Sequence, residues 1–340
     1  MRPQFWSGKK VLVTGGAGFI GSNTVARLLE LGAQVRVVDN LERGKLENLG
    51  NLLGYIEFRQ GDLRNKEISW QACQGVDIVI HLASKVGGIN YYLTKPGEVL
   101  LQNTLIDTLV LEAAKSCGVQ YYLYASSAHV YPIELQQRSD SPLLKEEEAI
   151  PAHPLLSYGW AKLLAEKQLE YAVAEEARPR VSILRLIGVY GKNQDLDLIT
   201  GSAIPVFIRR AIEHPQKKPF VVLGSGSETR SYCYISDVLD AVLLSIEKLD
   251  RQELVGPLNI GSESRIRIAE LAAEIIDISG KDIEIVYDSS HQTLIWGQAL
   301  NCSKARTVLD GWHPHISLRQ GLEMTYACIE ERLTSKRPKL

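Results

Sequence analysis

Residues 11–22 read VLVTGGAGFIGS, and the organisation of the chain can be inferred from this segment. A short apolar run at 11–14 enters a glycine-rich turn that carries Gly15, Gly18 and Gly21, and a helical pattern follows at 24–31. Glycines permit a tight turn and close approach to a pyrophosphate, while the helix N-terminus supplies N–H groups and partial positive charge. Glycine spacing alone is a weak signal, but strand, turn and helix in this order predict a dinucleotide site.

Strand and helix patterns alternate through the first half of the chain. Strands are expected at 11–14, 35–38, 55–58, 76–82, 121–125 and 181–186, and helices at 24–31, 103–116 and 158–174. Such alternation is typical of an α/β fold with a doubly wound parallel sheet of the Rossmann type.

The second half alternates less regularly. Helices are expected at 203–213, 236–249, 266–278, 303–309 and 318–333, and short strands at 220–223, 230–234, 258–260 and 283–287. We interpret residues 1–187 as a Rossmann domain with return segments near 235–262. Residues 188–335 form a smaller, partly interleaved C-terminal substrate lobe, and the tail at 335–340 is expected to be frayed.

Composition limits the function classes. Of the 340 residues, 45% are hydrophobic and 23% charged, as in a globular protein with a core. The net charge of −2 gives no electrostatic argument for binding nucleic acid or an anionic membrane. Five scattered cysteines without a CxxC pair indicate free thiols in a reducing compartment rather than disulfides or a metal site. Without a membrane-span or signal-peptide pattern, a cytoplasmic protein is expected.

Asp39 ends the second expected strand, 18 positions after Gly21. A carboxylate there accepts hydrogen bonds from an adenosine ribose and repels a 2′-phosphate, which favours NAD over NADP. The alternative is a simple turn aspartate. Arg36 and Arg43 lie nearby and would weaken the preference for NAD. Asp62, after the third expected strand, is a candidate adenine contact together with its neighbour Leu63.

Tyr158 and Lys162 are four residues apart on an expected helix and therefore share one face. A free tyrosine has a pKa of about 10, and an adjacent ammonium or an oxidised nicotinamide lowers it. The phenol could then accept a hydroxyl proton while hydride leaves the same carbon. Ser127 follows a strand at its carboxyl end, where ligands bind in an open parallel sheet. Each feature alone is weak, but their combination is specific.

The motifs together resemble those of the extended short-chain dehydrogenases/reductases that act on nucleotide sugars, over nearly the whole chain. They are TGGAGFIG at 14–21, HLAS at 81–84, YASSAHVYP at 124–132, YGWAK at 158–162, RLIGVYG at 185–191, TRSYCYISDV at 229–238, NIGS at 259–262 and GWHPHISLRQGL at 311–322. By this resemblance Ser127, Tyr158 and Lys162 are catalytic, and NAD is the cofactor.

The resemblance also implies two sets of contacts. The NAD contacts are Gly15, Gly18, Phe19, Ile20, Gly21, Asp39, Asn40, Asp62, Leu63, Leu82, Ala83, Ser84, Tyr158 and Lys162. The contacts to a nucleotide-activated sugar are Lys85, Gly87, Ser127, Ala128, His129, Ser202, Arg230 and Arg306. Among these, Arg230 is similar to the arginine that binds the diphosphate.

Within the family, KVGGI at 85–89 and SSAHVYP at 126–132 are most similar to GDP-mannose 3,5-epimerases and GDP-fucose synthases, which favours GDP-sugars over UDP- or dTDP-sugars. Those enzymes carry a cysteine where this chain has His129, and a lysine or histidine where it has Ser202. The 4,6-dehydratases carry an Asp-Glu pair at the positions of Ala128 and His129. These differences put 3,5-epimerisation in question and disfavour a dehydratase.

His129 has two interpretations. An imidazole titrates near neutrality and could move a proton at carbon 3 or 5, or it could hydrogen-bond a sugar hydroxyl or pack beneath the loop. Ser202 is interpreted as a substrate contact or a helix N-cap. The arginine and aspartate usual near Gln298 and Asn301 are absent, and Arg306 is the candidate replacement for that arginine.

These expectations favour an NAD-dependent nucleotide-sugar epimerase that acts through a transient keto sugar, oxidised at carbon 4. Enzymatic alternatives are a 4-dehydrogenase that releases the keto sugar and a GDP-mannose 3,5-epimerase-like activity. A non-enzymatic alternative is an NAD-sensing binding protein, although such members typically lose the tyrosine or lysine kept here. The resemblance further implies a homodimer that pairs through helices 103–116 and 158–174.

Overall fold

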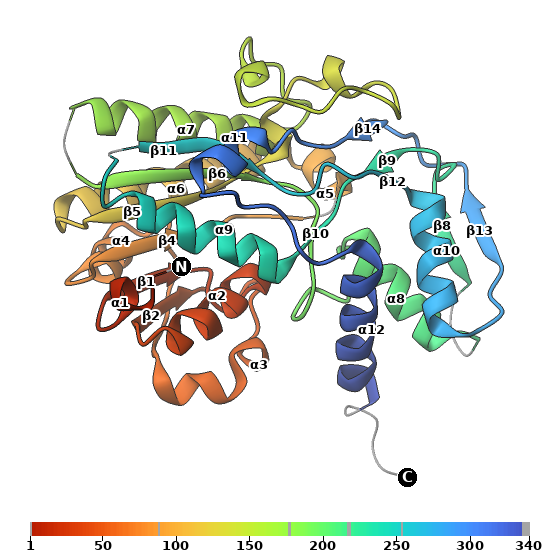
Figure 1. The fold of residues 1–340 in the computed structure, drawn as a ribbon, viewed down its shortest axis with the longest axis horizontal. Helices are drawn as coiled ribbons and strands as arrows, with labels where there is room; N and C mark the ends of the chain where they lie inside the picture. Colours follow the sequence, from red (N-terminus) through yellow and green to blue (C-terminus); the bar gives the residue numbers. More distant parts are fainter. Residues whose placement is uncertain (1, 88, 176–177, 216–218, 253, 335–340) are drawn as a thin grey trace.

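The computed structural model describes residues 2–87, 89–175, 178–215, 219–252 and 254–334, and its centre is a seven-stranded sheet (Figure 1). In spatial order the strands are β11 (Leu254–Ile260), β6 (Arg180–Leu186), β5 (Tyr121–Ser127), β4 (Ile78–His81), β1 (Lys10–Thr14), β2 (Gln34–Asp39) and β3 (Glu57–Gln60). Every neighbouring pair is parallel. Chain order reverses between β1 and β4, where the carboxyl ends of the strands leave a crevice for a ligand. The Rossmann-type prediction is confirmed.

Helices cover both faces of this sheet (Figure 1). One face carries α2 (Phe19–Glu30) and α9 (Ile235–Lys248), and the other carries α4 (Lys66–Cys73), α6 (Pro96–Ser116) and α7 (Ser157–Glu175). Side chains alternate along β1: Val11 and Val13 join the core on the α2 side, whereas Leu12 joins the core on the α6 side. With both faces buried, a strand reads as a continuous apolar run, as residues 11–13 do.

A second core lies in the C-terminal part of the chain. It is enclosed by α8 (Ala203–Glu213), α10 (Ile268–Ser279), α12 (Leu318–Thr334), β8 (Phe220–Leu223) and β13 (Ile285–Asp288). Two small sheets also lie in this part of the chain: β7 (Val189–Tyr190) pairs with β10 (Cys233–Tyr234), and β9 (Thr229–Arg230) pairs with β12 (Ile266–Arg267) and β14 (Gly297–Gln298). Between these segments the chain returns to the large sheet as α9 and β11.

The remaining elements are short. They are α1 (Pro3–Trp6), α3 (Leu46–Leu49), α5 (Ile89–Thr94), α11 (Ser303–Val308) and the 3₁₀ helices η1 (Gly50–Tyr55), η2 (Ala128–Val130), η3 (Ile133–Gln136) and η4 (Glu146–Ala149). No helix in the described part of the chain is both long and apolar enough to cross a membrane.

Two expected helices begin earlier than predicted. The helix expected at 24–31 starts at Phe19, directly after the glycine turn, so its first turn belongs to the ligand-binding end of the sheet. The helix expected at 103–116 starts at Pro96, because proline is well tolerated in the first turn. The helix α4 was not expected at all, although the Asn65 side chain accepts N–H bonds at its start, an ordinary N-cap signal.

Other expected bounds also differ, among them the strand expected at 258–260, which begins at Leu254. The strand expected at 55–58 lies at Glu57–Gln60, because η1 occupies the residues before it. The strand expected at 230–234 is divided into β9 and β10, which pair with different partners. The helix expected at 266–278 starts at Ile268, because its first two residues pair with β9 as a strand. The tail at 335–340 lies outside the described residues.

A buried ion pair joins α7 to the sheet. The Arg185 guanidinium of β6 donates to the Glu166 carboxylate of α7 at 2.7 Å from Nη2 and 3.0 Å from Nε, and both side chains are almost fully buried. The Ser126 hydroxyl donates to the same carboxylate, and Arg185 Nη1 donates to the Tyr131 hydroxyl at 3.1 Å. Because its partners satisfy each charge, this pair can remain ionised in the core.

Replacing Glu166→Ala should lower the free energy of unfolding by roughly 3–5 kcal/mol, because the Arg185 charge would stay buried without its partner. Urea unfolding followed by circular dichroism measures this loss. Glu323→Gln breaks an exposed ion pair with Arg319 and should leave stability unchanged. Equal stability of the two variants would show that the buried pair does not anchor α7.

Candidate active site

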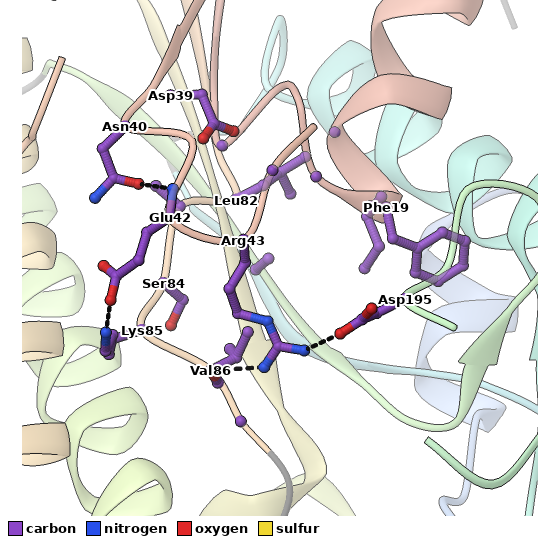
Figure 2. Close-up of a pocket in the computed structure, with 18 of the residues that line it drawn as sticks. Phe19, Asp39, Asn40, Glu42, Arg43, Leu82, Ser84, Lys85, Val86 and Asp195 are labelled. Carbon is purple, nitrogen blue, oxygen red and sulfur yellow. Dashed lines mark hydrogen bonds and ion pairs between the residues drawn. The ribbon is translucent and has the colours of Figure 1, made fainter. Parts of the chain in front are cut away.

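A cavity of about 450 Å³ opens at the carboxyl ends of β1, β2, β4 and β5 (Figure 2). All residues predicted to contact NAD line it: Gly15, Gly18, Phe19, Ile20, Gly21, Asp39, Asn40, Asp62, Leu63, Leu82, Ala83, Ser84, Tyr158 and Lys162. Of the predicted sugar contacts, Lys85, Gly87, Ser127 and Ser202 line it as well. The fold therefore brings the glycine turn and the predicted catalytic residues into one space.

The glycine turn allows α2 to begin against β1. A Cβ on Gly21 would lie 2.2 Å from the carbonyl oxygen of Gly15, and Gly15 itself has a φ of +68°. The first N–H groups of a helix have no partners within the helix, and here Phe19 and Ile20 place that end of α2 at the cavity wall. These features fit the pyrophosphate of a dinucleotide.

Asp39 is held by the backbone around it. Its carboxylate accepts the N–H of Ala17 at 3.0 Å and that of Leu41 at 2.8 Å. Burial raises the pKa of Asp39, and these two hydrogen bonds oppose the shift. A Cβ on Gly44 would lie 2.7 Å from the carboxylate oxygens, so the chain packs closely beside this group. A ribose hydroxyl fits there as a donor, whereas a 2′-phosphate would be crowded and repelled.

The two arginines near Asp39 in sequence are engaged elsewhere. Arg36 donates to Glu57 at 2.7 Å and to the carbonyls of Ala72 and Gln74. Arg43 donates to the Val86 carbonyl and to the Asp195 carboxylate rather than to Asp39 (Figure 2). Neither weakens the preference of this site for NAD.

Asp62 remains charged at the rim of the cavity. The Arg64 guanidinium donates to the Asp62 carboxylate, with Nε at 2.8 Å from Oδ1, and lowers the pKa of Asp62 to about 2. Asn40, another cavity residue, adds a side-chain hydrogen bond to the same carboxylate. Asp62 is thus a fixed acceptor at neutral pH.

Tyr158 and Lys162 occupy the first turns of α7, and Ser127 is the last residue of β5. The glycine between the two catalytic candidates has a structural role: a Cβ on Gly159 would lie 2.0 Å from the carbonyl oxygen of His129. Only glycine lets α7 begin so close to η2, which brings Tyr158 beside the end of β5. The spacing of the motif is therefore fixed by packing.

The Lys162 ammonium lies in a buried aromatic and acidic environment. Its Nζ is 4.5 Å from the centre of the Tyr124 ring and 5.7 Å from that of Tyr158. Burial lowers the pKa of Lys162, while the carboxylates of Asp107 and Glu166 oppose the shift. Sequence reasoning missed both carboxylates. Only the packing of α6 beside α7 brings Asp107 close, whereas Glu166 lies four residues after Lys162 on α7 and could have been found from that spacing.

Asp107 belongs to a chain of buried polar groups that reaches the glycine turn. It is hydrogen-bonded to His81 Nε2 at 3.0 Å and accepts the Tyr124 hydroxyl at 2.7 Å. On its other side, the His81 ring is hydrogen-bonded to the Thr14 hydroxyl at 2.8 Å, and that oxygen accepts the N–H groups of residues 82 and 83. Burial lowers the pKa of His81, so a neutral ring with its proton on Nε2 satisfies every partner.

The pKa of Tyr158 differs from expectation. Lys162 was expected to lower it, but burial raises the pKa of Tyr158 above its usual value, and the hydrogen bond with Ser84 opposes the shift only in part. Tyr158 is therefore protonated at neutral pH in the protein alone. A further positive charge in the cavity is needed before this phenol can act as a base.

Four predicted sugar contacts lie outside the cavity lining: Ala128, His129, Arg230 and Arg306. The His129 ring is half-buried and lies edge-on to Tyr158, with ring centres 5.8 Å apart, and desolvation together with Arg230 lowers its pKa to about 4. Arg230 is half-buried and donates to the carbonyls of Thr229 and Ile295. Arg306 is half-exposed, 3.8 Å from a carboxylate oxygen of residue 263.

Several lining residues carried no prediction. They are Val38, Glu42, Gly44, Lys45, Asn48, Gly61, Arg64, Val86, Ile106, Ala125, Leu186, Asn193, Gln194, Asp195, Thr200, Gly201 and Arg332, together with Arg43, which was noted only as a cation near Asp39. Those at 42–48 could have been found from their position just after Asp39. The segment 193–201 has no such local signal, because only the fold of the second part brings it to the cavity.

The cavity holds no set of metal ligands. Among the described residues, no group of three or more His, Cys, Asp or Glu side chains is placed to hold a metal ion. All five cysteines are described and are free thiols, as expected from their spacing.

Comparisons with known proteins agree with this geometry. The family model described as "NAD dependent epimerase/dehydratase family" matches residues 11–261. GDP-mannose 3,5-epimerase of Arabidopsis thaliana is 29% identical over 340 residues, which cover 99% of this chain and 87% of that protein. A putative UDP-glucose 4-epimerase of Methanocaldococcus jannaschii is 29% identical, covering 92% of this chain and 96% of the other.

Solved structures show the same fold. UDP-glucose 4-epimerase of Thermotoga maritima with UDP-glucose has a TM-score of 0.84 and 30% identity, covering 95% of this chain and 99% of that one. The Thermus thermophilus UDP-glucose 4-epimerase complex with NAD has a TM-score of 0.80 and 26% identity, covering 94% of this chain and 98% of that one.

Gly21→Ala should abolish measurable NADH binding, because the added Cβ would push the start of α2 away from the Gly15 carbonyl. Titration followed by NADH fluorescence measures the binding. Gly97→Ala is the matched control: it lies in the first turn of α6, where a Cβ meets nothing within 4 Å, and should bind NADH normally. Normal binding by Gly21→Ala would contradict the assignment of the glycine turn.

Proposed function

The chain belongs to the NAD dependent epimerase/dehydratase family, and from this premise we propose that it is a nucleotide-sugar epimerase that acts through a transient keto sugar oxidised at carbon 4. One observation carries the proposal: Ser127, Tyr158 and Lys162 line the same cavity as the glycine turn and Asp39. The residues at the cavity fit NAD, which supplies a hydride acceptor for the sugar carbon and returns the hydride within one cycle.

Each catalytic side chain has one task. Tyr158 takes the proton of the carbon 4 hydroxyl and later gives a proton back to the sugar oxygen. Lys162 stabilises the phenolate by its charge, and Ser127 positions the reacting oxygen through its hydroxyl. The buried network of Asp107 and His81 holds the Lys162 side of the site in place. NAD held at the glycine turn and Asp39 would supply the hydride for reduction of the opposite face of the keto sugar, which would change the configuration at carbon 4.

His129 supports epimerisation at carbon 4 over the 3,5-epimerase alternative. With a pKa lowered to about 4, its imidazole is neutral at pH 7 and a weak base for a proton on a sugar carbon. Its ring is packed against Tyr92 and Tyr158, with ring centres 6.4 and 5.8 Å away. In this proposal His129 is a packing or sugar-contact residue.

The substrate is proposed to be a nucleotide-activated sugar. Its diphosphate is assigned to Arg230, with residues 188–335 forming the substrate lobe and residues 1–187, with returns near 235–262, holding NAD. GDP-sugars come first among candidates, because the GDP-mannose 3,5-epimerase relative matches 99% of this chain. UDP-sugars follow, because UDP-glucose is present in the Thermotoga maritima structure.

We also propose a homodimer formed through α6 and α7, which pack side by side. Six large apolar side chains on these helices are exposed: Leu100, Leu101, Leu105, Trp160, Leu164 and Tyr171. An apolar patch on two packed helices favours an interaction surface at this place. A two-fold axis along the helix pair would make the patch self-complementary.

Tyr158→Phe should reduce turnover by about 100- to 10,000-fold, the usual contribution of a positioned general base, while NADH binding remains. Turnover is measured by chromatography of the sugar nucleotide after incubation. Tyr55→Phe, at an exposed tyrosine outside the cavity lining, should keep full activity. Retained turnover in Tyr158→Phe would remove the basis of the proposed mechanism.

A panel of GDP-, UDP- and dTDP-sugars separates the enzymatic alternatives. The proposed epimerase should give an isomeric sugar, changed at carbon 4, with no net NADH. Net NADH with a keto sugar would instead identify a 4-dehydrogenase, and change at carbons 3 and 5 would identify the 3,5-epimerase. No reaction with any sugar, combined with NADH binding, would favour an NAD-sensing protein.

Leu164→Glu should convert the dimer to a monomer, because it buries one new carboxylate from each subunit in an apolar contact at the two-fold axis. Sedimentation equilibrium measures the mass. Met324→Glu places the same charge at an exposed apolar position on α12 and should leave the dimer intact. A dimer that persists in Leu164→Glu would place the interface elsewhere.

A further inference from the structure

The Arg43 side chain crosses the cofactor cavity (Figure 2). It leaves the backbone four residues after Asp39, and its guanidinium donates to the Val86 carbonyl at 2.8 Å and to Asp195 Oδ2 at 2.9 Å. Val86 follows β4, whereas Asp195 lies between β7 and α8 in the second part of the chain. One side chain thus joins three segments of the cavity wall.

The Asp195 carboxylate is held in place by hydrogen bonds from its own segment. The Thr200 hydroxyl donates to Oδ2 at 3.0 Å, and the N–H of Asp197 donates to Oδ1 at 3.2 Å. Lys45 Nζ lies 3.8 Å from Oδ1. Burial alone would raise the pKa of Asp195, but these hydrogen bonds and cations hold it below its usual value. The carboxylate is therefore ionised and oriented at neutral pH.

The segment that carries Asp195 is fixed to the glycine-turn helix. Asn23 on α2 donates to the Lys192 carbonyl at 3.0 Å. Asn193 donates to the Ser22 hydroxyl at 3.0 Å and to the Asn48 carbonyl at 3.2 Å. The acceptor end of the Arg43 bridge is consequently anchored to the same helix whose first turn faces the cavity.

A second bridge lies beside the first. Glu42 forms an ion pair with Lys85, which comes just before Val86 in the loop after β4 (Figure 2). Glu42, Arg43, Lys85 and Asp195 all line the cavity. The side chains of Arg43 and Asp195 are 34% and 30% exposed, so their pair lies at the solvent side and can open and close.

We propose that the Arg43–Asp195 ion pair is a latch that retains the dinucleotide in its cavity. While the pair is closed, the segment after β2 and the segment before α8 are joined across the space that the ligand must cross to leave. Release then requires the pair to break, so Arg43 and Asp195 set the dissociation rate. This inference goes beyond the proposed function, because it concerns NADH binding in the absence of any sugar.

Asp195→Asn tests the latch. NADH is bound to the full-length protein and displaced with excess NAD in a stopped-flow instrument, with nicotinamide fluorescence as the signal. The variant should release NADH about fivefold faster, the factor for a partly exposed ion pair of about 1 kcal/mol. Glu57→Gln breaks the Arg36 ion pair outside the cavity lining and should release NADH at the normal rate.

Salt gives a second measurement that needs no substitution. Raising ionic strength weakens a partly exposed pair, so release from the unaltered protein should accelerate with salt, and release from Asp195→Asn should depend on salt much less. Release from Asp195→Asn at the normal rate, or equal salt dependence in both proteins, would overturn the latch. Faster release in Arg43→Gln but not in Asp195→Asn would also overturn it, because Arg43 would then act on the ligand alone.

Discussion

The close approach of α2 to the glycine turn is the constraint on which the rest of the cavity depends. Because no Cβ stands between Gly21 and the Gly15 carbonyl, the helix starts directly at the end of β1. Its free N–H groups then meet the crevice that the reversal of strand order opens between β1 and β4. Asp39 and Ser127 reach the same space because β2 and β5 end at the same edge of the sheet.

The second feature of this structure is a set of buried charged side chains near Tyr158. Lys162 has no ion pair at hydrogen-bond distance among the described contacts, and its charge is supported by the Tyr124 ring and by two nearby carboxylates. Each carboxylate has its own hydrogen-bonded partners, Asp107 with His81 and Glu166 with Arg185. This arrangement keeps the Lys162 ammonium buried away from solvent and close to the Tyr158 phenol. Tyr158 is itself protonated in the protein alone, which links its activation to occupancy of the cavity.

Residues from both parts of the chain line the cavity and contact one another there. The segment 192–195 is bonded to α2 and α3, and Arg43 reaches from the sheet edge to Asp195. Retention of NAD by such a bridge would suit an enzyme that oxidises and reduces one sugar within one cycle, since the cofactor then never needs to leave. The same cavity residues would then serve both NAD binding and catalysis.

Local sequence was sufficient for the fold class, the glycine turn, Asp39 and the Tyr158–Lys162 pair. Each of these depends on neighbours a few residues away: backbone freedom at a turn, alternation of apolar runs, or one helical turn of spacing. The bounds of β9 and β10 were beyond such reasoning, because their partners come from distant segments. The same holds for the pairing of Arg43 with Asp195, 152 positions apart. The burial that raises the pKa of Tyr158 in the protein alone was also missed, because burial is a property of the packed chain. The local sequence determines turns, strands and helices, because these depend on residues that are close in the chain. Long-range charge pairing and desolvation were decided only by the tertiary structure, because strand order and helix packing bring distant residues together.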